Sequence, residues 1–277
     1  MGYFLGLFGY GPNPSAALVK DSAIVAFAEE ERFNRIKTAP SHLPTNALLY
    51  CLKEAGIGLG DLDGVGFGWE CDRYVEAMPV FYEELRLKYP SVENEYNLLQ
   101  EQYLLNLYHP SRIRVDLCQA LALRGHLLDP LRIEFIPHHL CHAASAYYCS
   151  GFSEASILTV DGSGEEFSTF MWHGVGDRIK EMKSVKLPHS LGGFYASFTE
   201  FLGFKAYQDE GKLMGLAPYG EYSAEIQAKV DEVLPYDPDS GEFQTNPYMR
   251  YLGARTYGRR FTDRFVDEFH PGRVQVY

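Results

Sequence analysis

The stretch HHLCHAASAYYCSGFSEASILTVDGSG, residues 138–164, joins a histidine cluster, an alanine-rich segment, an apolar run and an acidic turn with two glycines. The alanine-rich segment that begins at His138 predicts a helix, because alanine favours helices strongly and its neighbours keep a helical spacing. The run from Ser156 to Val160 predicts a buried strand that ends at Asp161. A carboxylate at a strand end, followed by glycines, is where α/β folds place cation and phosphate chemistry.

Two histidines of this stretch are candidate metal ligands. His138 and His142 lie four residues apart, so a helix places both imidazoles on one face. Together with the carboxylate of Asp161 they form a ligand set that suits iron, zinc or manganese. The alternative is a polar helix start in which one imidazole caps the helix and the others are solvated. The sequence alone does not show that Asp161 approaches the histidines.

The composition excludes some classes of function. The chain has 277 residues, which suits two domains of ordinary size. Its net charge of −12 argues against a nucleic-acid platform, which needs clustered Lys and Arg. Five cysteines without CxxC spacing, and no basic leader at the amino terminus, predict a reducing compartment. No run approaches the roughly 20 apolar residues that span a bilayer. We therefore expect a cytoplasmic protein that is not bound to a membrane.

The sequence predicts two related α/β lobes with a cleft between them. Residues 3–7, 16–19 and 24–28 predict three strands, with a glycine-rich loop at 9–14 that can bring backbone amides near an anion. An ordinary hairpin is the alternative. We expect a first lobe at residues 1–152, with a helical insertion at about 72–130. A second strand–hairpin set begins near Ser156 and predicts a partial second lobe at residues 153–277.

Helices are also predicted at residues 45–55 and 192–202. The first pattern places three leucines on one face and is followed by Gly56, a typical helix stop. The second is an amphipathic pattern.

Two further segments carry candidate phosphate ligands. The charged run at 29–37 ends in Lys37, and the segment DEGKLMGLAPYG at 209–220 contains Lys212 between Gly211 and Gly215. A lysine can neutralise a phosphate, and glycines permit a close approach of the backbone. The alternatives are a solvated charged turn for the first segment and a Gly/Pro-rich loop with a surface lysine for the second.

Four ordered blocks together resemble the amino-terminal domain of the O-carbamoyltransferases of nodulation-factor and antibiotic biosynthesis. They follow the glycine-rich start and are SAALVKDSAIVAFAEEERFNRIK (15–37), HHLCHAASAYY (138–148), TVDGSGE (159–165) and GKLMGLAPYG (211–220). The resemblance implies an actin- and sugar-kinase-like (ASKHA) fold with two ribonuclease-H-like lobes, of which the second is incomplete here.

The resemblance also implies a reaction and its site. Carbamoyl phosphate and ATP would give a carbamoyl-adenylate, whose carbamoyl group passes to a hydroxyl of a small metabolite or sugar. A divalent metal would be held by His138, His142 and Asp161; iron is the metal that the resemblance implies, with zinc and manganese as alternatives. Nucleotide and phosphate groups would be bound by Lys37, Gly162, Ser163, Gly164, Gly211, Lys212 and Gly215.

The sequence departs from the family pattern in two places. Asn13-Pro14 stands where many relatives carry a His-Asp pair, whose histidine is a candidate base, so the catalytic role of Asn13 is open. The carboxy-terminal domain, where relatives form the adenylate, is absent. We therefore expect a fragment or one half of a split enzyme, whose partner is the missing domain or a separate subunit. The alternatives are a tRNA threonylcarbamoyl-transferase-like subunit and an inactive nucleotide-binding or interaction module of the same fold.

Overall fold

A computed structural model represents the whole chain, and the structure describes residues 2–90, 97–129, 132–249 and 259–269, with the backbone alone at 97–100. The described chain forms two compact units. The first comprises Met1–Ala77 and Leu104–Cys141, and the second comprises Met78–Tyr103 and His142–Tyr277. The predicted lobe boundary at residue 152 stays a prediction. No helix among the described residues has the length and apolar character needed to cross a membrane.

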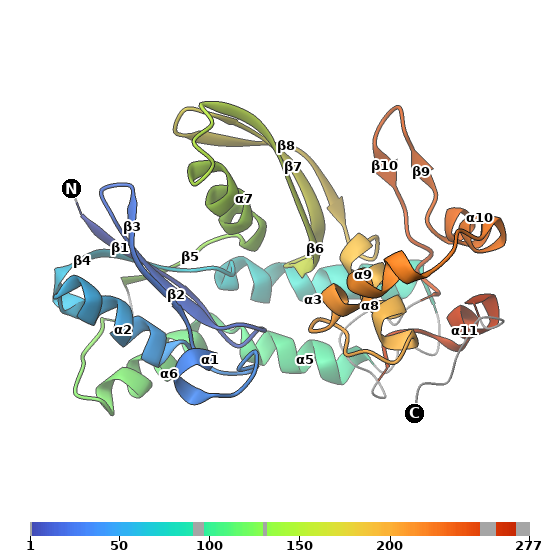
Figure 1. The fold of residues 1–277 in the computed structure, drawn as a ribbon. Helices are drawn as coiled ribbons and strands as arrows, with labels where there is room; N and C mark the ends of the chain where they lie inside the picture. Colours follow the sequence, from blue (N-terminus) through green and yellow to red (C-terminus); the bar gives the residue numbers. More distant parts are fainter. Residues whose placement is uncertain (1, 91–96, 130–131, 250–258, 270–277) are drawn as a thin grey trace. The chain divides into compact units, whose positions relative to one another are not determined.

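The first unit is built on a mixed five-stranded sheet in the order β3-β2-β1-β4-β5 (Figure 1). β1 (Tyr3–Phe8), β2 (Ser15–Lys20) and β3 (Ala23–Glu29) form an antiparallel meander, which confirms the three predicted strands. β4 (Leu62–Phe67) pairs in parallel with β1, and β5 (Ile133–Phe135) pairs in parallel with β4. β2 is therefore antiparallel to the other four strands.

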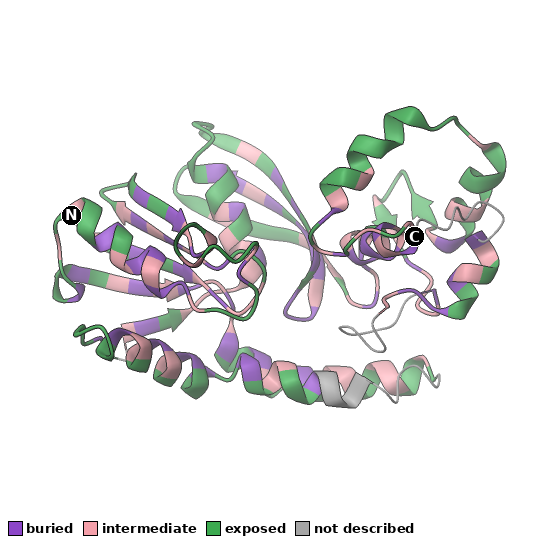
Figure 2. Ribbon diagram, turned by 60° about the horizontal axis from the view of Figure 1, so that its bottom comes forward, coloured by how far each residue is buried: buried purple, intermediate pink, exposed green. Residues whose placement is uncertain are grey.

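Helices bury one face of this sheet. Buried and exposed residues alternate along the strands, as Figure 2 shows, and Leu5, Leu7 and Leu18 turn to the buried face. α2 (Thr45–Ala55) packs on β2 and β3 and begins and ends where predicted; Gly56 terminates it in the left-handed conformation, with φ +66°. In the part of the chain that the structure describes, the other helical segments that begin before residue 123 are α1 (Glu31–Asn34), η1 (Leu59–Asp61), α3 (Cys71–Lys88), α5 (Asn97–Leu107) and α6 (Pro110–Ala122).

The second unit contains an antiparallel sheet of β6 (Glu154–Gly164), β7 (Phe167–Val175) and β8 (Arg178–Lys186). α7 (His138–Tyr148) begins in the first unit and continues into the second, where Tyr147 packs against Gly174 of β7. α8 (Leu191–Phe201) packs on β6, close to the predicted helix at 192–202. The remaining elements among the described residues are α9 (Glu210–Leu216), η3 (Ala217–Tyr219), α10 (Ala224–Val233), β9 (Tyr236–Asp237), β10 (Glu242–Phe243) and α11 (Asp263–Phe269).

Two segments differ from their predicted local structure. β6 does not end at Asp161 but continues to Gly164, with an irregular register between Val160 and Gly164. The chain reverses one step later, at Glu165, whose φ is +50°. The second difference is α9, because the segment around Gly211 and Gly215 is helical, whereas the sequence offers a Gly/Pro-rich loop as an alternative there. Glycine lowers helix propensity without forbidding a helix, so the local pattern favours the loop there.

Candidate metal centre

α7 carries both histidines of the candidate centre, and the predicted helix is confirmed. His138 is partly buried at the start of the helix, and His142 lies one turn later with an exposed side chain. Their spacing on one helix places the two imidazoles on the same face. The local geometry is therefore the one that the four-residue spacing predicts.

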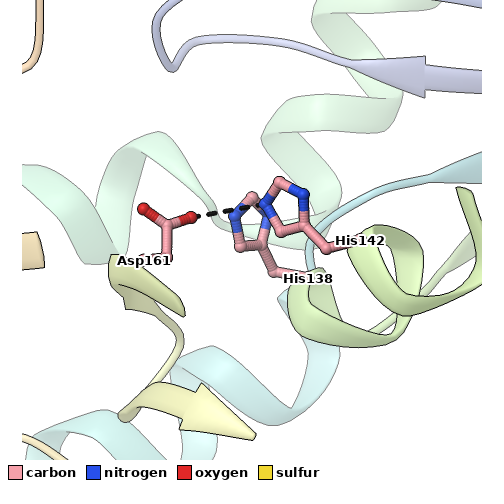
Figure 3. A group of neighbouring side chains, drawn as sticks. All are labelled: His138, His142 and Asp161. Carbon is pink, nitrogen blue, oxygen red and sulfur yellow. Dashed lines mark ion pairs between the residues drawn. The ribbon is translucent and has the colours of Figure 1, made fainter. Parts of the chain in front are cut away.

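β6 brings the carboxylate of Asp161 to these imidazoles (Figure 3). His142 Nε2 lies 3.3 Å from Asp161 Oδ2, and one ligand atom from each of the three residues lies within 4.8 Å of the others. With metal–ligand distances of about 2.0–2.2 Å, two atoms on one ion can be at most roughly 4.4 Å apart. Displacements of the ligand atoms by a few tenths of an ångström would therefore let all three groups coordinate one ion.

The ring of His138 is oriented by the end of β4. Its Nδ1 lies 3.2 Å from the carbonyl oxygen of Gly68. A neutral imidazole that donates its Nδ1 proton to this carbonyl leaves Nε2 as the metal-ligand atom. Fixing the ring in this way is the usual role of a carbonyl behind a metal-binding histidine. The indole of Trp69 lies 5.1 Å from the His138 ring and stacks on Tyr108 at 4.5 Å, so aromatic groups restrict rotation of the imidazole.

The sequence prediction missed Gly68 and Trp69 as neighbours of the centre. The structure places both directly after β4, and the carboxyl ends of parallel strands are where α/β proteins bind ligands. The strand pattern does not show which residue of a later helix will lie against that end. The contact with His138 depends on tertiary structure.

Asp161 has its two carboxylate oxygens in different roles. Oδ1 accepts a hydrogen bond of 2.6 Å from the backbone N–H of Gly162, and Oδ2 faces His142. The side chain of Asp161 is about one third exposed. One oxygen is therefore held by the backbone while the other is directed at the histidine.

The glycine-rich loop at 9–14 is held by backbone and side-chain contacts. Asn13 is exposed and has φ +57°, a left-handed conformation that asparagine tolerates better than most residues. Its backbone N–H donates to Thr38 O at 2.9 Å. Tyr10 donates its hydroxyl proton to Asp116 at 2.5 Å, and burial together with this carboxylate raises the pKa of Tyr10. The loop is thus anchored to α6.

The candidate phosphate ligands lie on separate elements. Lys37 is exposed after α1, and Ser163 is exposed on β6 between the buried Gly162 and Gly164. Lys212 forms an ion pair of 2.7 Å with the buried carboxylate of Asp209. Binding of a phosphate by Lys212 would therefore compete with Asp209.

The space beside the predicted phosphate-binding glycines is filled at Gly162 and open at Gly211 and Gly215. A Cβ at Gly162 would lie 2.6 Å from the ring of Tyr207, so the absence of a side chain there accommodates tyrosine. Gly211 and Gly215 lie in α9, and a Cβ at either position would meet no atom within 4 Å. Their role in binding a nucleotide stays a prediction.

Comparison with known proteins identifies the family. The chain is 36% identical over 279 residues to the uncharacterized protein sll1178 of Synechocystis sp., covering 96% of this chain and 42% of that protein. It is also 36% identical over 214 residues to the nodulation protein NolNO of Sinorhizobium fredii, covering 75% of this chain and 28% of that one. The chain therefore spans less than half the length of these two relatives.

A solved structure of YeaZ from Pseudomonas aeruginosa matches 68% of each chain with a TM-score of 0.34 and 12% identity. Residues 4–273 match the family described as Carbamoyltransferase N-terminus. The four sequence blocks that resembled this family lie within the matched residues. The chain belongs to the family of carbamoyltransferase amino-terminal domains.

Proposed function

We propose that the chain is the part of an O-carbamoyltransferase that binds a divalent metal through His138, His142 and Asp161. Carbamoyl phosphate and ATP would supply a carbamoyl-adenylate, and the carbamoyl group would pass to a hydroxyl of a small metabolite or sugar. One observation carries the proposal: in a member of this family, His142 Nε2 lies 3.3 Å from Asp161 Oδ2, with His138 one helical turn away.

The donor set fits a metal on chemical grounds. Two imidazole nitrogens and one carboxylate oxygen suit iron, zinc or manganese, and we propose iron first because of the family resemblance. When bound, such a metal supplies Lewis-acid stabilisation of the negative charge on the adenylate phosphate. Gly68 would keep the His138 ring in the tautomer that coordinates, and Trp69 would restrict its rotation.

Asn13 has a limited role in this proposal. An amide side chain donates and accepts hydrogen bonds but does not take up a proton at neutral pH. Asn13 would therefore orient the acceptor hydroxyl, and another group would take up the proton of that hydroxyl. The presence of Asn13 in place of a histidine also favours the second candidate function, an inactive nucleotide-binding module. For such a module, calorimetry would find ATP binding and the transfer assay would find no carbamoylated product.

The strand order supports an ASKHA fold for this function. The order β3-β2-β1-β4-β5, with β2 antiparallel to the other strands, is the arrangement of a ribonuclease-H-like lobe. The meander of β6, β7 and β8 repeats its first three strands. We propose that this repetition reflects two related lobes, the second of them partial.

Metal binding is tested by titrating the 277-residue chain with Fe²⁺ without oxygen, and with Zn²⁺ and Mn²⁺, in a calorimeter. We expect one ion per chain, and we expect His142→Ala or Asp161→Ala to weaken binding more than roughly 100-fold, because even outer partners of a ligand contribute 10–100-fold. The matched control is His173→Ala. His173 pairs with Glu154 at 2.9 Å and has no part in the group of three. Equal affinities in all variants would reject the centre.

Transfer is tested by mass spectrometry. The chain would be mixed with carbamoyl phosphate, ATP, a panel of hydroxylated acceptors and the carboxy-terminal part of a full-length relative. We expect an acceptor that gains one carbamoyl group, and we expect Asp161→Ala to abolish the gain. A tRNA mobility shift at low salt tests the alternative of a tRNA threonylcarbamoyl-transferase-like subunit, and we expect no shift, given the net charge of −12.

A further inference from the structure

We propose that Ser190 and Gly192, at the start of α8, are positioning residues that hold the backbone of Asp161 so that its carboxylate faces His142. This inference rests on the proposed metal centre. It concerns residues about 30 positions from Asp161 in the sequence that are not among the three proposed ligands.

The backbone of β6 is weakly held by its own sheet at this point. The β6–β7 ladder pairs Val160 with Thr169 and then Gly164 with Phe167, and its register shifts between the two pairs. Asp161 therefore lies in a stretch where the regular ladder is interrupted. Another part of the unit must fix the backbone if the carboxylate is to keep one position.

Ser190 supplies the first of these contacts. Its Oγ lies 2.8 Å from Gly162 O and 3.2 Å from Asp161 O, and it accepts a hydrogen bond of 2.9 Å from Gly193 N–H. A hydroxyl has one proton and two lone pairs, so it can donate to this pair of carbonyls and cap the helix at once. The Ser190 side chain is completely buried. It joins the start of α8 to the irregular part of β6.

Gly192 supplies the second contact. A Cβ at this position would lie 2.5 Å from Asp161 C and 2.6 Å from both Asp161 O and Gly162 N. All three atoms belong to the backbone, so no side-chain rotation relieves the overlap. The φ of Gly192 is outside the left-handed region, and alanine would otherwise suit a helix. The requirement for glycine therefore comes from the close approach to Asp161.

The two contacts explain why the carboxylate has one orientation. With the backbone of Asp161 held by α8, the N–H of Gly162 binds Oδ1 at 2.6 Å and leaves Oδ2 toward His142. A Cβ at Gly192 would push α8 and β6 apart by nearly 1 Å, the difference between 2.5 Å and an ordinary contact of 3.4 Å. A displacement of that size exceeds what a preorganised site tolerates, which is about 0.5 Å.

The test compares Gly192→Ala and Ser190→Ala with two matched controls in the 277-residue chain. Gly60→Ala adds a methyl group where no atom lies within 4 Å, and Ser223→Ala removes the N-cap of α10, which bonds only its own helix in the described contacts. Co²⁺ is the probe: calorimetry gives its affinity, and its visible absorption reports the ligand geometry. Circular dichroism and thermal melting report folding.

We expect both α8 variants to bind Co²⁺ about 10–100-fold more weakly and with an altered spectrum, as for other outer partners of metal ligands. We expect both controls to match the wild-type affinity and spectrum, whatever their melting temperatures. If Ser190→Ala does not fold, Gly192→Ala decides, since it leaves the helix cap in place.

The inference and the metal centre can fail separately. If the wild-type chain takes up no metal, the proposed centre is wrong and the positioning role falls with it. If the wild type binds Co²⁺ and Asp161→Ala does not, but the α8 variants bind with wild-type affinity and spectrum, the centre stands and the inference is overturned. A lower melting temperature alone would assign Ser190 and Gly192 a structural role and would also overturn it.

Discussion

Each side chain of the candidate centre is oriented by a different partner. His138 is directed by a carbonyl at the end of β4, and Asp161 by the backbone N–H of its own neighbour. His142 has an exposed ring and meets Asp161 directly. Backbone atoms therefore hold two groups of the centre, and a small rotation of the exposed His142 ring is the simplest way to close it around an ion.

The titration of His189 links the stability of the chain to pH. Burial lowers the pKa of its ring, a hydrogen bond with the backbone of Thr245 opposes this in part, and the positive charge of Lys88 lowers the pKa as well. Above the usual histidine pKa of about 6.5 the ring is neutral in both folded and unfolded chains. Below that pH the unfolded chain takes up a proton that the folded chain resists, so stability is lost as pH falls.

We expect His189→Gln to reduce this acid sensitivity. The melting temperature of the wild type should fall more steeply than that of the variant between about pH 7 and pH 5. His126→Gln, at an exposed position, is the control and should keep the wild-type slope. Parallel curves for wild type and His189→Gln would contradict the prediction.

The cysteines are predicted to differ in reactivity. Cys51 and Cys71 are buried, whereas Cys149, just after α7, is exposed. Burial raises the pKa of the Cys51 thiol, which lowers its fraction of reactive thiolate. We expect a maleimide to modify Cys149 first and Cys51 and Cys71 only on unfolding, as peptide mass spectrometry would show. Equally fast modification of Cys51 and Cys149 would disprove this.

At the scale of elements, the start of α2 depends on a carboxylate from another segment. Glu30 is buried, and it accepts hydrogen bonds from the backbone N–H groups of Asn46 and Ala47, each at 3.0 Å. A negative charge at a helix N-terminus also interacts favourably with the helix dipole. The charged run at 29–37 therefore contributes to folding at this position.

We expect Glu30→Ala to lower the free energy of unfolding by roughly 2–3 kcal/mol, because it removes a helix cap and leaves buried N–H groups without acceptors. Urea denaturation measures the change. Glu54→Ala, at an exposed position of α2, is the control and should stay within about 0.5 kcal/mol of the wild type. Equal effects of the two substitutions would show that the cap contributes little.

At the scale of the whole molecule, each unit has its own core and its own tryptophan. The chain has two tryptophans, Trp69 in the first unit and Trp172 in the second, and both are buried. Phe265 is completely buried in a cluster of the second unit, where it contacts Phe198 and Phe269 with ring centroids 4.8 Å away.

We expect Phe265→Ala to lower the stability of the second unit by about 3–5 kcal/mol, the usual cost of removing a buried phenylalanine ring. The Trp69→Phe background leaves Trp172 as the only fluorescent tryptophan, and the Trp172→Phe background leaves Trp69. Phe265→Ala should shift the urea midpoint more in the first background than in the second. Each single-tryptophan variant without the Phe265 change is the control. Identical shifts would show that the two units unfold as one.

Much of the fold was predictable because its signals are local. The three first strands, α2 with its stop at Gly56, α7 and α8 follow from periodicity, propensity and end signals within each segment. The end of β6 and the helix at Glu210–Leu216 differ from the local sequence patterns, because glycines weaken both patterns.

The sequence by itself determined that two histidines share a helical face and that the chain has carbamoyltransferase blocks. Both properties depend on spacing within short segments. Only the tertiary structure decided that Asp161 meets His142, that Gly68 orients His138, and that Ser190 and Gly192 hold the end of β6. These are contacts between segments separated by about 20 to 70 residues. Their geometry is set by packing, which no local pattern contains.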